Sequence, residues 1–372
     1  MVYKRPVWAE IDHSAIEKNI QTIKNTLEDT TLFMAVVKAN AYGHGMIEVA
    51  KTAVAAGADR LGVALLEEAV ALRDAGIKVP VQVLSEIPQS GVADALDSDI
   101  MLSIYTEAML DKVKDEAIRR RKKVKVHLKV DTGMNRAGAK PKEARSLYEQ
   151  IINDEYIELE GVFTHFAVAD DPSETFTSKQ LDELLKLKKD FKADLIWHAA
   201  NSAATLFFPE SQLDMVRIGI ALYGLQPSHV LKSKIELVPA LSLKAKIALV
   251  KDLKEGDGLS YGLTYRAGRD HLVGVLPIGY ADGYSRILSN RSEVLIQGIR
   301  SPVIGRVCMD QLLVAIPDDI QLLDSEVITL IGRDNGECIT AEELGDIMGT
   351  INYEIICSIS ERVPRIDLRS DT

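Results

Sequence analysis

Cysteine is scarce in this sequence, and no run of apolar residues is long. The 372 residues include three cysteines, Cys308, Cys338 and Cys357, without a CxxC pair, so neither a zinc ribbon nor a disulfide-stabilised extracellular scaffold is indicated. No apolar run approaches the roughly 20 residues that a helix needs to span a bilayer. The first residues, MVYKRPVWAEID, lack the apolar core of a signal peptide. We therefore expect a cytoplasmic protein with no membrane partner.

Positive charge is also in short supply, and several catalytic motifs are missing. Lys and Arg number 44 against 55 Asp and Glu, which gives a formal net charge of −11. So acidic a chain is poorly suited to nucleic acid. No GxGxxG follows the first predicted strand, there is no Walker loop or GxSxG, and the seven histidines form no HxH or HExxH pair. These absences count against dinucleotide binding, serine hydrolysis and a metal site.

The first two-thirds of the chain alternate short apolar runs with amphipathic stretches. Segments such as EEAVALRDAGI and EAMLDKVKDEAIRRRKK have the apolar spacing of helices. Eight apolar runs are predicted as strands: 32–38, 60–65, 79–85, 99–105, 124–131, 157–165, 195–200 and 215–220. Repeated βα units build a parallel sheet covered by helices, and eight of them favour a closed (β/α)8 barrel of the TIM type. An open flavodoxin-like sheet is the alternative.

After about residue 226 the helical stretches give way to short strands separated by Gly, Asp, Asn and Pro turns. One helical stretch, TAEELGDIMG, interrupts them, and Thr340 is placed to cap it. The sequence thus predicts an α/β protein, with a (β/α)8 barrel over residues 11–230 followed by a mainly β C-terminal domain over residues 231–372. Residues 1–10 form a segment that can pack with this second domain.

Lys38 is the most unusual residue of the predicted barrel, because a lysine seldom closes an apolar, buried strand. Catalytic side chains of such barrels lie at the carboxyl ends of the strands, where Lys38 falls. Its functional interpretation is an amine desolvated enough to form a Schiff base with a carbonyl compound. The alternative is a lysine that extends to solvent. Gly43 and Gly45 would let the following backbone approach a ligand.

Other polar residues follow the later strands and would converge on the same mouth of the barrel. They are Lys129, Asp131, Arg136, Thr164, His165, Asn201, Ser202 and Arg217. Taken alone, each of these residues is equally well explained as an ordinary polar loop residue or as a core histidine whose hydrogen bonds are satisfied. Together they make a cationic mouth within an acidic chain, which suits an anionic ligand such as a phosphate ester.

Three tyrosines of the second domain, Tyr261, Tyr280 and Tyr353, lie in Gly/Asp-rich or strand-end settings. They are candidates for acid–base chemistry, which requires a lowered pKa. The alternative is that they are half-buried aromatic residues of a sheet. With the missing motifs, the residues favour chemistry by an organic cofactor held on a lysine.

Eight segments resemble, in order and along essentially the whole chain, the sequence blocks of the alanine racemase family. They are AVVKANAYGHG, KVDTGMNRAG, HAANSAAT, MVRIGIALYG, SYGLTY, PIGYADGYSR, GRVCMDQ and INYEIICSISERVPR. The resemblance implies a barrel followed by a β domain, and pyridoxal 5'-phosphate as cofactor. It also implies racemisation of alanine, which supplies D-alanine for peptidoglycan, and a homodimer whose subunits share each active site.

The resemblance also implies residue roles. Lys38 matches the lysine that holds the cofactor and acts as one base, and Tyr261 matches the opposite base, which the partner subunit contributes. Arg217 matches the arginine that faces the pyridine nitrogen. The positions that match cofactor-binding residues are Lys38, Tyr42, Arg136, His165, Asn201, Ser202, Arg217, Gly219, Ile220 and Tyr353. Those that match substrate-contacting or entrance residues are Arg136, Met309, Asp310 and Tyr280. Lys129 matches a lysine that is carbamylated in members of the family.

Three other functions stay open at this point. A racemase that prefers serine or accepts many amino acids would carry the same segments. Another lysine-anchored barrel enzyme, such as an amino-acid decarboxylase, would share the barrel segments. SYGLTY and GRVCMDQ favour racemisation over it, because they match the opposite-face base and its surroundings. A non-enzymatic cofactor-binding barrel would lack the second domain.

Overall fold

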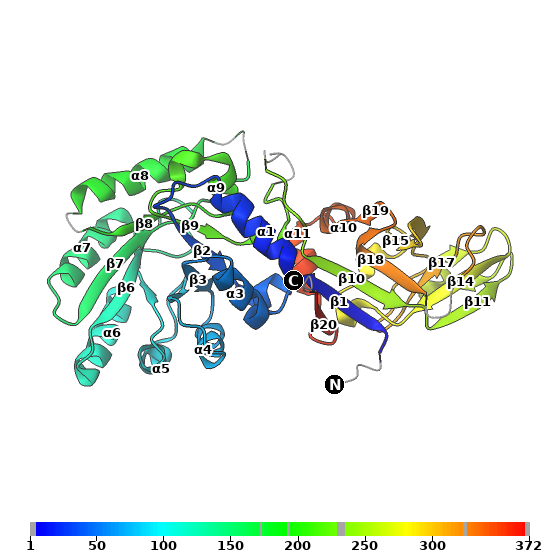
Figure 1. The fold of residues 1–372 in the computed structure, drawn as a ribbon, viewed down its shortest axis with the longest axis horizontal. Helices are drawn as coiled ribbons and strands as arrows, with labels where there is room; N and C mark the ends of the chain where they lie inside the picture. The colour runs from blue at the N-terminus through cyan, green and yellow to red at the C-terminus, as the bar shows by residue number, and fades with distance from the viewer. Residues whose placement is uncertain are drawn as a thin grey trace. The chain divides into compact units, whose positions relative to one another are not determined.

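The computed structural model describes residues 5–171, 173, 175–191, 194–228, 235–322 and 326–368. As far as they are described, the residues form two compact units (Figure 1). Ile16–Ala41 and Gly45–Val238 make up the barrel unit, and Met1–Ala15, Tyr42–His44 and Pro239–Thr372 make up the β unit. The chain thus enters the β unit for three residues soon after Lys38 and then returns to the barrel.

The barrel unit contains all eight predicted strands. They are β2 (Leu32–Val36), β3 (Arg60–Val63), β4 (Val81–Val83), β5 (Leu102–Ile104), β6 (Val124–Lys129), β7 (Ile157–Phe163), β8 (Ile196–His198) and β9 (Met215–Ile218). Parallel pairing runs in the orders β9-β2-β3-β4 and β5-β6-β7-β8. A bridge from Gln82 to Met101 connects the two sheets at one seam, and the Arg217 N–H donates to Ala200 O at the other. The ring is therefore closed, which confirms the barrel and excludes the open sheet.

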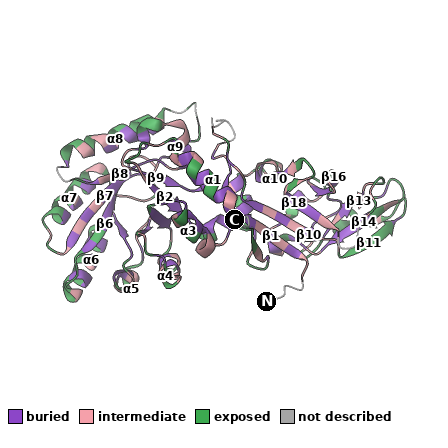
Figure 2. Cartoon of the chain, viewed as in Figure 1, coloured by how far each residue is buried: buried purple, intermediate pink, exposed green. Residues whose placement is uncertain are grey.

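The strands of the barrel are buried along nearly their whole length, and the helices turn one face toward them (Figure 2). The helices of this unit are α1 (His13–Lys24), α2 (Lys38–Tyr42), α3 (Met46–Ala55), α4 (Leu66–Asp74), α5 (Val92–Asp97), α6 (Glu107–Arg120), α7 (Pro141–Ile152), α8 (Phe176–Asp190) and α9 (Ser202–Phe207), the first and second of which cross the unit boundary. Short 3-10 turns are η1 (Gln89–Gly91), η2 (Pro209–Ser211) and η3 (Ile220–Tyr223).

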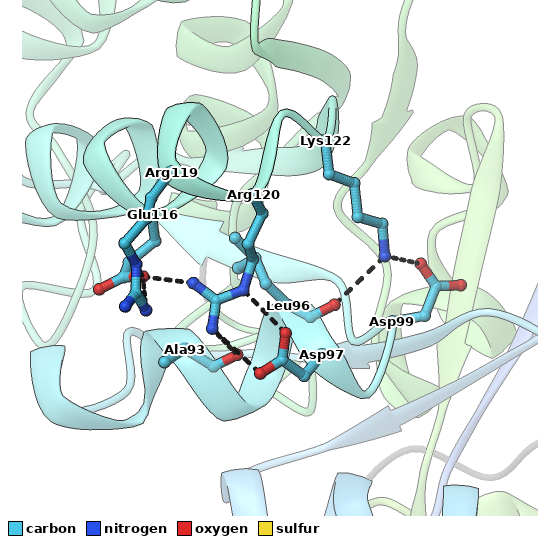
Figure 3. A network of polar contacts seen from close by, with 8 residues as sticks. All are labelled: Ala93, Leu96, Asp97, Asp99, Glu116, Arg119, Arg120 and Lys122. Atoms are coloured by element: carbon cyan, nitrogen blue, oxygen red, sulfur yellow. Dashed lines mark hydrogen bonds and ion pairs between the residues drawn. The ribbon is translucent and has the colours of Figure 1, made fainter.

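Helix α6 illustrates how the sequence sets these elements. Thr106 Oγ1 accepts the N–H of Met109 and caps the first turn. At the other end Arg120 lies between Glu116 of its own helix and Asp97 of α5, with 2.8 Å from Nε to Asp97 Oδ1 (Figure 3). Cationic side chains are favourable at a helix carboxyl end, so this contact stabilises the end of α6 and ties it to α5, while Arg121, whose φ is 50°, terminates the helix itself.

The β unit is built around a sheet of order β16-β15-β18-β10-β1-β20, with β19 paired to β18. Its strands are β1 (Val7–Asp12), β10 (Leu241–Lys246), β15 (Glu293–Ile296), β16 (Ile299–Pro302), β18 (Val327–Asp334), β19 (Glu337–Ile339) and β20 (Arg365–Leu368). A second sheet has the order β11-β14-β17, and β12 and β13 form a hairpin. These strands are β11 (Leu249–Leu253), β12 (Gly258–Leu259), β13 (Tyr265–Arg266), β14 (His271–Leu276) and β17 (Leu312–Ala315).

The N-terminal segment belongs to this unit. Strand β1 pairs antiparallel with β10 and parallel with β20. Arg5 donates to both oxygens of the buried Asp282 carboxylate at 2.6 and 2.5 Å. The sequence boundary at residue 11 falls inside β1, because apolar alternation alone does not tell which sheet a strand joins.

The helices of the β unit are α10 (Ala341–Met348) and α11 (Asn352–Ser358), with 3-10 turns η4 (Tyr261–Leu263), η5 (Tyr280–Asp282) and η6 (Arg286–Leu288). Thr340 caps α10 by accepting the N–H of Glu343 at 3.0 Å, as predicted. Helix α11 was not expected, since its adjacent isoleucines favour a strand. Packing of the buried Ile355 and Ile356 overrides that preference. Among the described residues no helix is both long and apolar enough to cross a membrane.

Candidate active site

Lys38 lies at the start of an unusual backbone turn. Residues 39–42 all have positive φ, between 51 and 53°, although none of them is glycine and the left-handed conformation costs about 1–2 kcal/mol per residue. Hydrogen bonds hold the turn. Its first backbone N–H donates to Glu68 Oε1 at 2.6 Å, and Asn40 Oδ1 accepts the N–H of Met46 at 2.8 Å. The backbone beside the Lys38 amine is therefore fixed from two helices, α3 and α4.

The predicted cationic mouth of the barrel is present. Burial first, and then the positive charges of Arg217, Arg136, Lys129 and Lys38, lower the pKa of His165 to about 3. Burial and the charges of Arg217, Arg136 and Lys38 likewise lower the pKa of Lys129 to about 8. Such mutual effects require short separations, so five of the residues singled out in the sequence lie around one site.

Arg217 is buried at the centre of this mouth, with 4% of its surface exposed. Its Nη2 donates to Thr164 O at 2.8 Å and Ala199 O at 3.0 Å and lies 3.3 Å from His165 Nδ1. Its Nη1 lies 3.0 Å from His198 Nδ1. All these acceptors are neutral, and burial lowers the pKa of Arg217 to about 9. The guanidinium is thus held in place by neutral acceptors, and no carboxylate neutralises its charge at those contacts.

Ser202 lies beside a set of backbone donors that follow strand β9. Its Oγ accepts the N–H of Gly219 at 2.9 Å and that of Ala221 at 3.4 Å, where η3 begins at Ile220. Asn201 caps α9 by accepting the N–H of Ala204 at 3.0 Å. Clustered backbone N–H groups and a hydroxyl are the donors that bind phosphate.

Tyr42 and Tyr353 meet within the β unit. Their ring centroids are 6.1 Å apart, and Tyr353 lies on α11 rather than at a strand end. Between them the backbone of Gly43 passes so close to α11 that an added Cβ would lie 2.3 Å from Ile356 O, and its φ is +84°. Only glycine fits there. Burial raises the pKa of Tyr42, so its phenol keeps its proton at neutral pH.

Tyr261 lies at a separate place in the β unit and is 72% exposed. It lines a pocket of about 850 Å³ together with Met309 and Asp310. Backbone bonds at 3.0 Å, from the Tyr280 N–H to Cys308 O and from the Ala281 N–H to Met309 O, join η5 to this pocket. Asp310 Oδ1 accepts from Arg362 at 2.6 Å. The carboxylate of Asp310 is therefore already paired.

The sequence did not single out His127 and His198, which are completely buried in β6 and β8. Each stands inside an apolar run that predicts a strand, so a polar ring in a buried strand was the signal available. Asp131, which the sequence placed at the mouth, accepts the N–H groups of Gly133 and Asn135 and shapes its own loop. Within the described residues no group of three or more His, Cys, Asp or Glu side chains is arranged to hold a metal ion.

Buried neutral histidines predict acid sensitivity of the cofactor-free protein. His165 and His198 have lowered pKa values in the folded state, by burial first and then by Arg217, while both take up a proton near pH 6.5 once unfolded. The unfolded state then binds more protons below pH 6.5, so stability falls as the pH falls. From pH 7 to pH 5 His165, whose folded-state pKa is about 3, costs about 2 kcal/mol.

Urea unfolding at pH 7 and pH 5 at constant ionic strength measures this loss, to which His165 contributes about 2 kcal/mol. Carboxylates change the free energy of unfolding mainly below pH 5, because their pKa in the unfolded chain lies near 4. His165→Gln is expected to reduce the difference by about 2 kcal/mol. Equal free energies of unfolding at the two pH values would contradict the prediction.

The fold and these side chains define a class of protein: a (β/α)8-barrel enzyme with a lysine at a cationic mouth and a mainly β second domain. The family profiles "Alanine racemase, N-terminal domain" and "Alanine racemase, C-terminal domain" match residues 11–227 and 240–367. The chain belongs to the alanine racemase family, and it is an isomerase that acts on amino acids. The resemblance noted in the sequence is thereby confirmed.

Relatives align along the whole chain. An alanine racemase of Methanococcus maripaludis is 44% identical over 369 residues, which cover 98% of this chain and 99% of the relative. The solved alanine racemase of Bacillus anthracis with bound L-Ala-P has a TM-score of 0.93 at 41% identity, covering 100% of this chain and 97% of that one. The solved histidine racemase of Leuconostoc mesenteroides has a TM-score of 0.91 at 32% identity, covering 98% and 99%.

Proposed function

We propose that this enzyme interconverts L- and D-alanine with pyridoxal 5'-phosphate as cofactor and with two bases, Lys38 and Tyr261 of the partner subunit. The observation that carries the proposal is the barrel mouth. There an amine, a buried guanidinium and a Ser202 donor set surround a site for an anionic ring compound. The product D-alanine would serve peptidoglycan synthesis in the cytoplasm.

The donor set fits the cofactor group by group. Ser202 and the backbone at Gly219 and Ile220 would hold the phosphate, with Tyr42 and Tyr353 completing its surroundings. Arg217 would donate to the pyridine nitrogen, and His165 would support Arg217. When bound, pyridoxal phosphate spreads the negative charge that remains after an α-proton is removed.

The chain's own residues would then handle the proton. Lys38 Nζ takes the α-proton from one face of the substrate or returns it there, and the phenol oxygen of the partner subunit's Tyr261 does so on the other face. Because Arg217 has a pKa of about 9, it keeps its proton at pH 7. The ring nitrogen would stay unprotonated, which limits charge delocalisation and with it side reactions such as transamination.

The exposure of Tyr261 beside its pocket supports the homodimer that the resemblance implies, because an acid–base group at the surface can act on a substrate bound to a second molecule. Arg136, together with the turn at Met309 and Asp310 of the partner subunit, would meet the substrate carboxylate. Since the Asp310 carboxylate is paired with Arg362, the backbone of the turn would make that contact. Tyr280 and Tyr353 would line the entrance.

We also propose that Lys129 carries a carbamate. Its lowered pKa of about 8 leaves more of the amine neutral near pH 7 than is usual for lysine. A neutral amine forms an N–C bond with carbon dioxide and releases a proton to water. The negative charge so created would orient Arg136.

A circular-dichroism assay of L-alanine, L-serine and L-histidine tests the proposed activity. We expect kcat/KM for alanine to exceed the kcat/KM values for serine and histidine by at least about tenfold. This ratio corresponds to roughly 1.4 kcal/mol, a difference that one or two added groups on the substrate side chain readily produce. L-Histidine is included because a histidine racemase shares this fold. A higher kcat/KM for serine or histidine would reassign the substrate. Release of carbon dioxide with formation of the corresponding amine, and without formation of the D-amino acid, would indicate a decarboxylase.

A further inference from the structure

A file of hydrogen-bonded side chains leads from Arg217 through the barrel interior. His198 Nδ1 lies 3.0 Å from Arg217 Nη1, and His198 Nε2 lies 2.9 Å from His127 Nδ1. His127 Nε2 lies 3.1 Å from Glu160 Oε2, which also accepts from Arg60 Nη1 at 2.5 Å. All five residues belong to the barrel unit, and both histidines are fully buried.

The direction of every hydrogen in this file is fixed by its two ends. A guanidinium only donates, so His198 Nδ1 must accept, and a neutral His198 then carries its proton on Nε2. That N–H donates to His127 Nδ1, which places the His127 proton on Nε2, toward Glu160. Burial lowers the pKa of both histidines and keeps them neutral. Although burial raises the pKa of Glu160, hydrogen bonds from His127 and Arg60 hold it well below its usual range.

The backbone makes room for this arrangement. The register of β6 against β7 shifts between Val126 and His127, which brings His127 opposite Gly161. A Cβ on Gly161 would lie 2.5 Å from His127 Cε1, so only glycine leaves space for the ring. The His198 ring stacks on Phe163 at 4.7 Å with an interplanar angle of 12°. Both rings are thus held by packing as well as by hydrogen bonds.

The far end of the file reaches the opposite mouth of the barrel. Glu160 and Lys125 line a pocket of about 360 Å³ there, among the amino-terminal ends of β4 and β6. Lys125 Nζ lies 3.0 Å from Glu160 Oε1. The carboxylate is therefore anchored on both oxygens, while the arginine at the other end faces the proposed cofactor site.

We propose that Glu160 is a positioning residue for the reaction. Through His127 it fixes the tautomer of His198, the ring that Arg217 contacts. It thereby fixes the position of the guanidinium that faces the cofactor ring. The inference rests on the proposed function for its last step, the contact of Arg217 with the ring. Loss of the carboxylate removes the only acceptor that His127 Nε2–H has in this file. Arg217 alone then opposes the second tautomer of each histidine, so that tautomer becomes populated even though it directs an N–H of His198 toward Arg217.

Nitrogen-15 labelling of the histidines in the holoenzyme tests this directly, because proton–nitrogen correlation spectra distinguish the two neutral tautomers. At pH 7 we expect His127 and His198 each as a single Nε2–H tautomer in the unsubstituted enzyme. Glu160→Ala is expected to give mixed tautomers at both. Glu160→Gln keeps an acceptor oxygen and the side-chain volume, so it guards against misfolding and is expected to retain the tautomers.

Kinetics and the absorption of the bound cofactor provide the second readout. Glu160→Ala is expected to lower kcat about tenfold, as loss of an outer hydrogen-bond partner typically does, with KM changed less than twofold and the cofactor absorption band shifted. The matched control is Glu158→Gln on the same strand, whose exposed carboxylate pairs with Lys123 and Lys125. It is expected to leave the spectra unchanged and kcat within twofold.

Three outcomes test the positioning role of Glu160 separately from the proposed function. Unchanged histidine tautomers and an unchanged cofactor band in Glu160→Ala overturn the positioning role, even if the enzyme racemises alanine. Equal effects of Glu158→Gln and Glu160→Ala overturn it as well, since the strand and not the file would then be responsible. If Glu160→Ala shows mixed tautomers but the unsubstituted protein racemises no alanine, the file is supported and the proposed function is refuted.

Discussion

Replacing Lys38 by alanine is expected to lower kcat for alanine racemisation about 10⁴-fold or more, with little change in folding. A positioned general base contributes about 10²–10⁴-fold, and the amine is also proposed to hold the cofactor. Lys38 follows strand β2 and is held beside the turn at residues 39–42. Lys129, the other lysine of the mouth that the structure describes, directs its Nζ to Leu84 O at 2.8 Å and is therefore not placed to replace the Lys38 amine.

The measurement combines the circular-dichroism assay with borohydride reduction of the unsubstituted enzyme, which makes the cofactor link permanent. Peptide mass analysis should find the label on Lys38. Lys51→Ala is the matched control, since that surface lysine pairs with Glu48 at 2.7 Å on α3. It should change kcat less than twofold. Label on any other lysine, or substantial activity of Lys38→Ala, would refute the assignment.

Replacing Tyr261 by phenylalanine is expected to abolish exchange of the α-proton from one enantiomer while the other still exchanges. Two bases on opposite faces each act on one enantiomer, so removing one phenol leaves Lys38 to exchange the proton on its own face. Net racemisation should fall about 10²–10⁴-fold. Because enantiomers have equal free energies, kcat/KM must fall equally in both directions, and steady-state rates alone cannot reveal the asymmetry.

Proton exchange in deuterium oxide, followed separately for L- and D-alanine by NMR, provides the required measurement. Tyr265→Phe is the matched control. Tyr265 lies on the hairpin of β12 and β13, and its phenol oxygen is 3.2 Å from His271 Nε2. Its exchange rates should stay within twofold for both enantiomers. If Tyr261→Phe slows both exchanges equally and slightly, Tyr261 is not a base.

The barrel was predictable because burial on both faces is a local property of composition. Each strand of a parallel barrel is an apolar run, and Lys38 is conspicuous as the residue that ends one of them. The cationic mouth followed from the rule that carboxyl ends of parallel strands meet. Composition also revealed the second domain, whose strands are short and separated by turn residues.

What escaped prediction depends on contacts between distant segments. The turn at residues 39–42 needs Glu68 and Met46 to hold it, and no residue type within it favours positive φ strongly enough by itself. Helix α11 has isoleucines that favour a strand. The hydrogen-bonded file from Arg217 to Glu160 joins four strands, and sequence spacing does not tell which buried histidine faces which.

The left-handed turn has a consequence for the order in which the molecule assembles. In an unfolded chain residues 39–42 strongly favour right-handed or extended conformations, so the turn forms only after α3 and α4 have packed and present Met46 and Glu68. Lys38 therefore acquires its final surroundings late, when much of the barrel already exists. If Lys38 holds the cofactor as proposed, a newly synthesised chain would bind it productively only near the end of folding, and cofactor attachment would then mark the completed molecule.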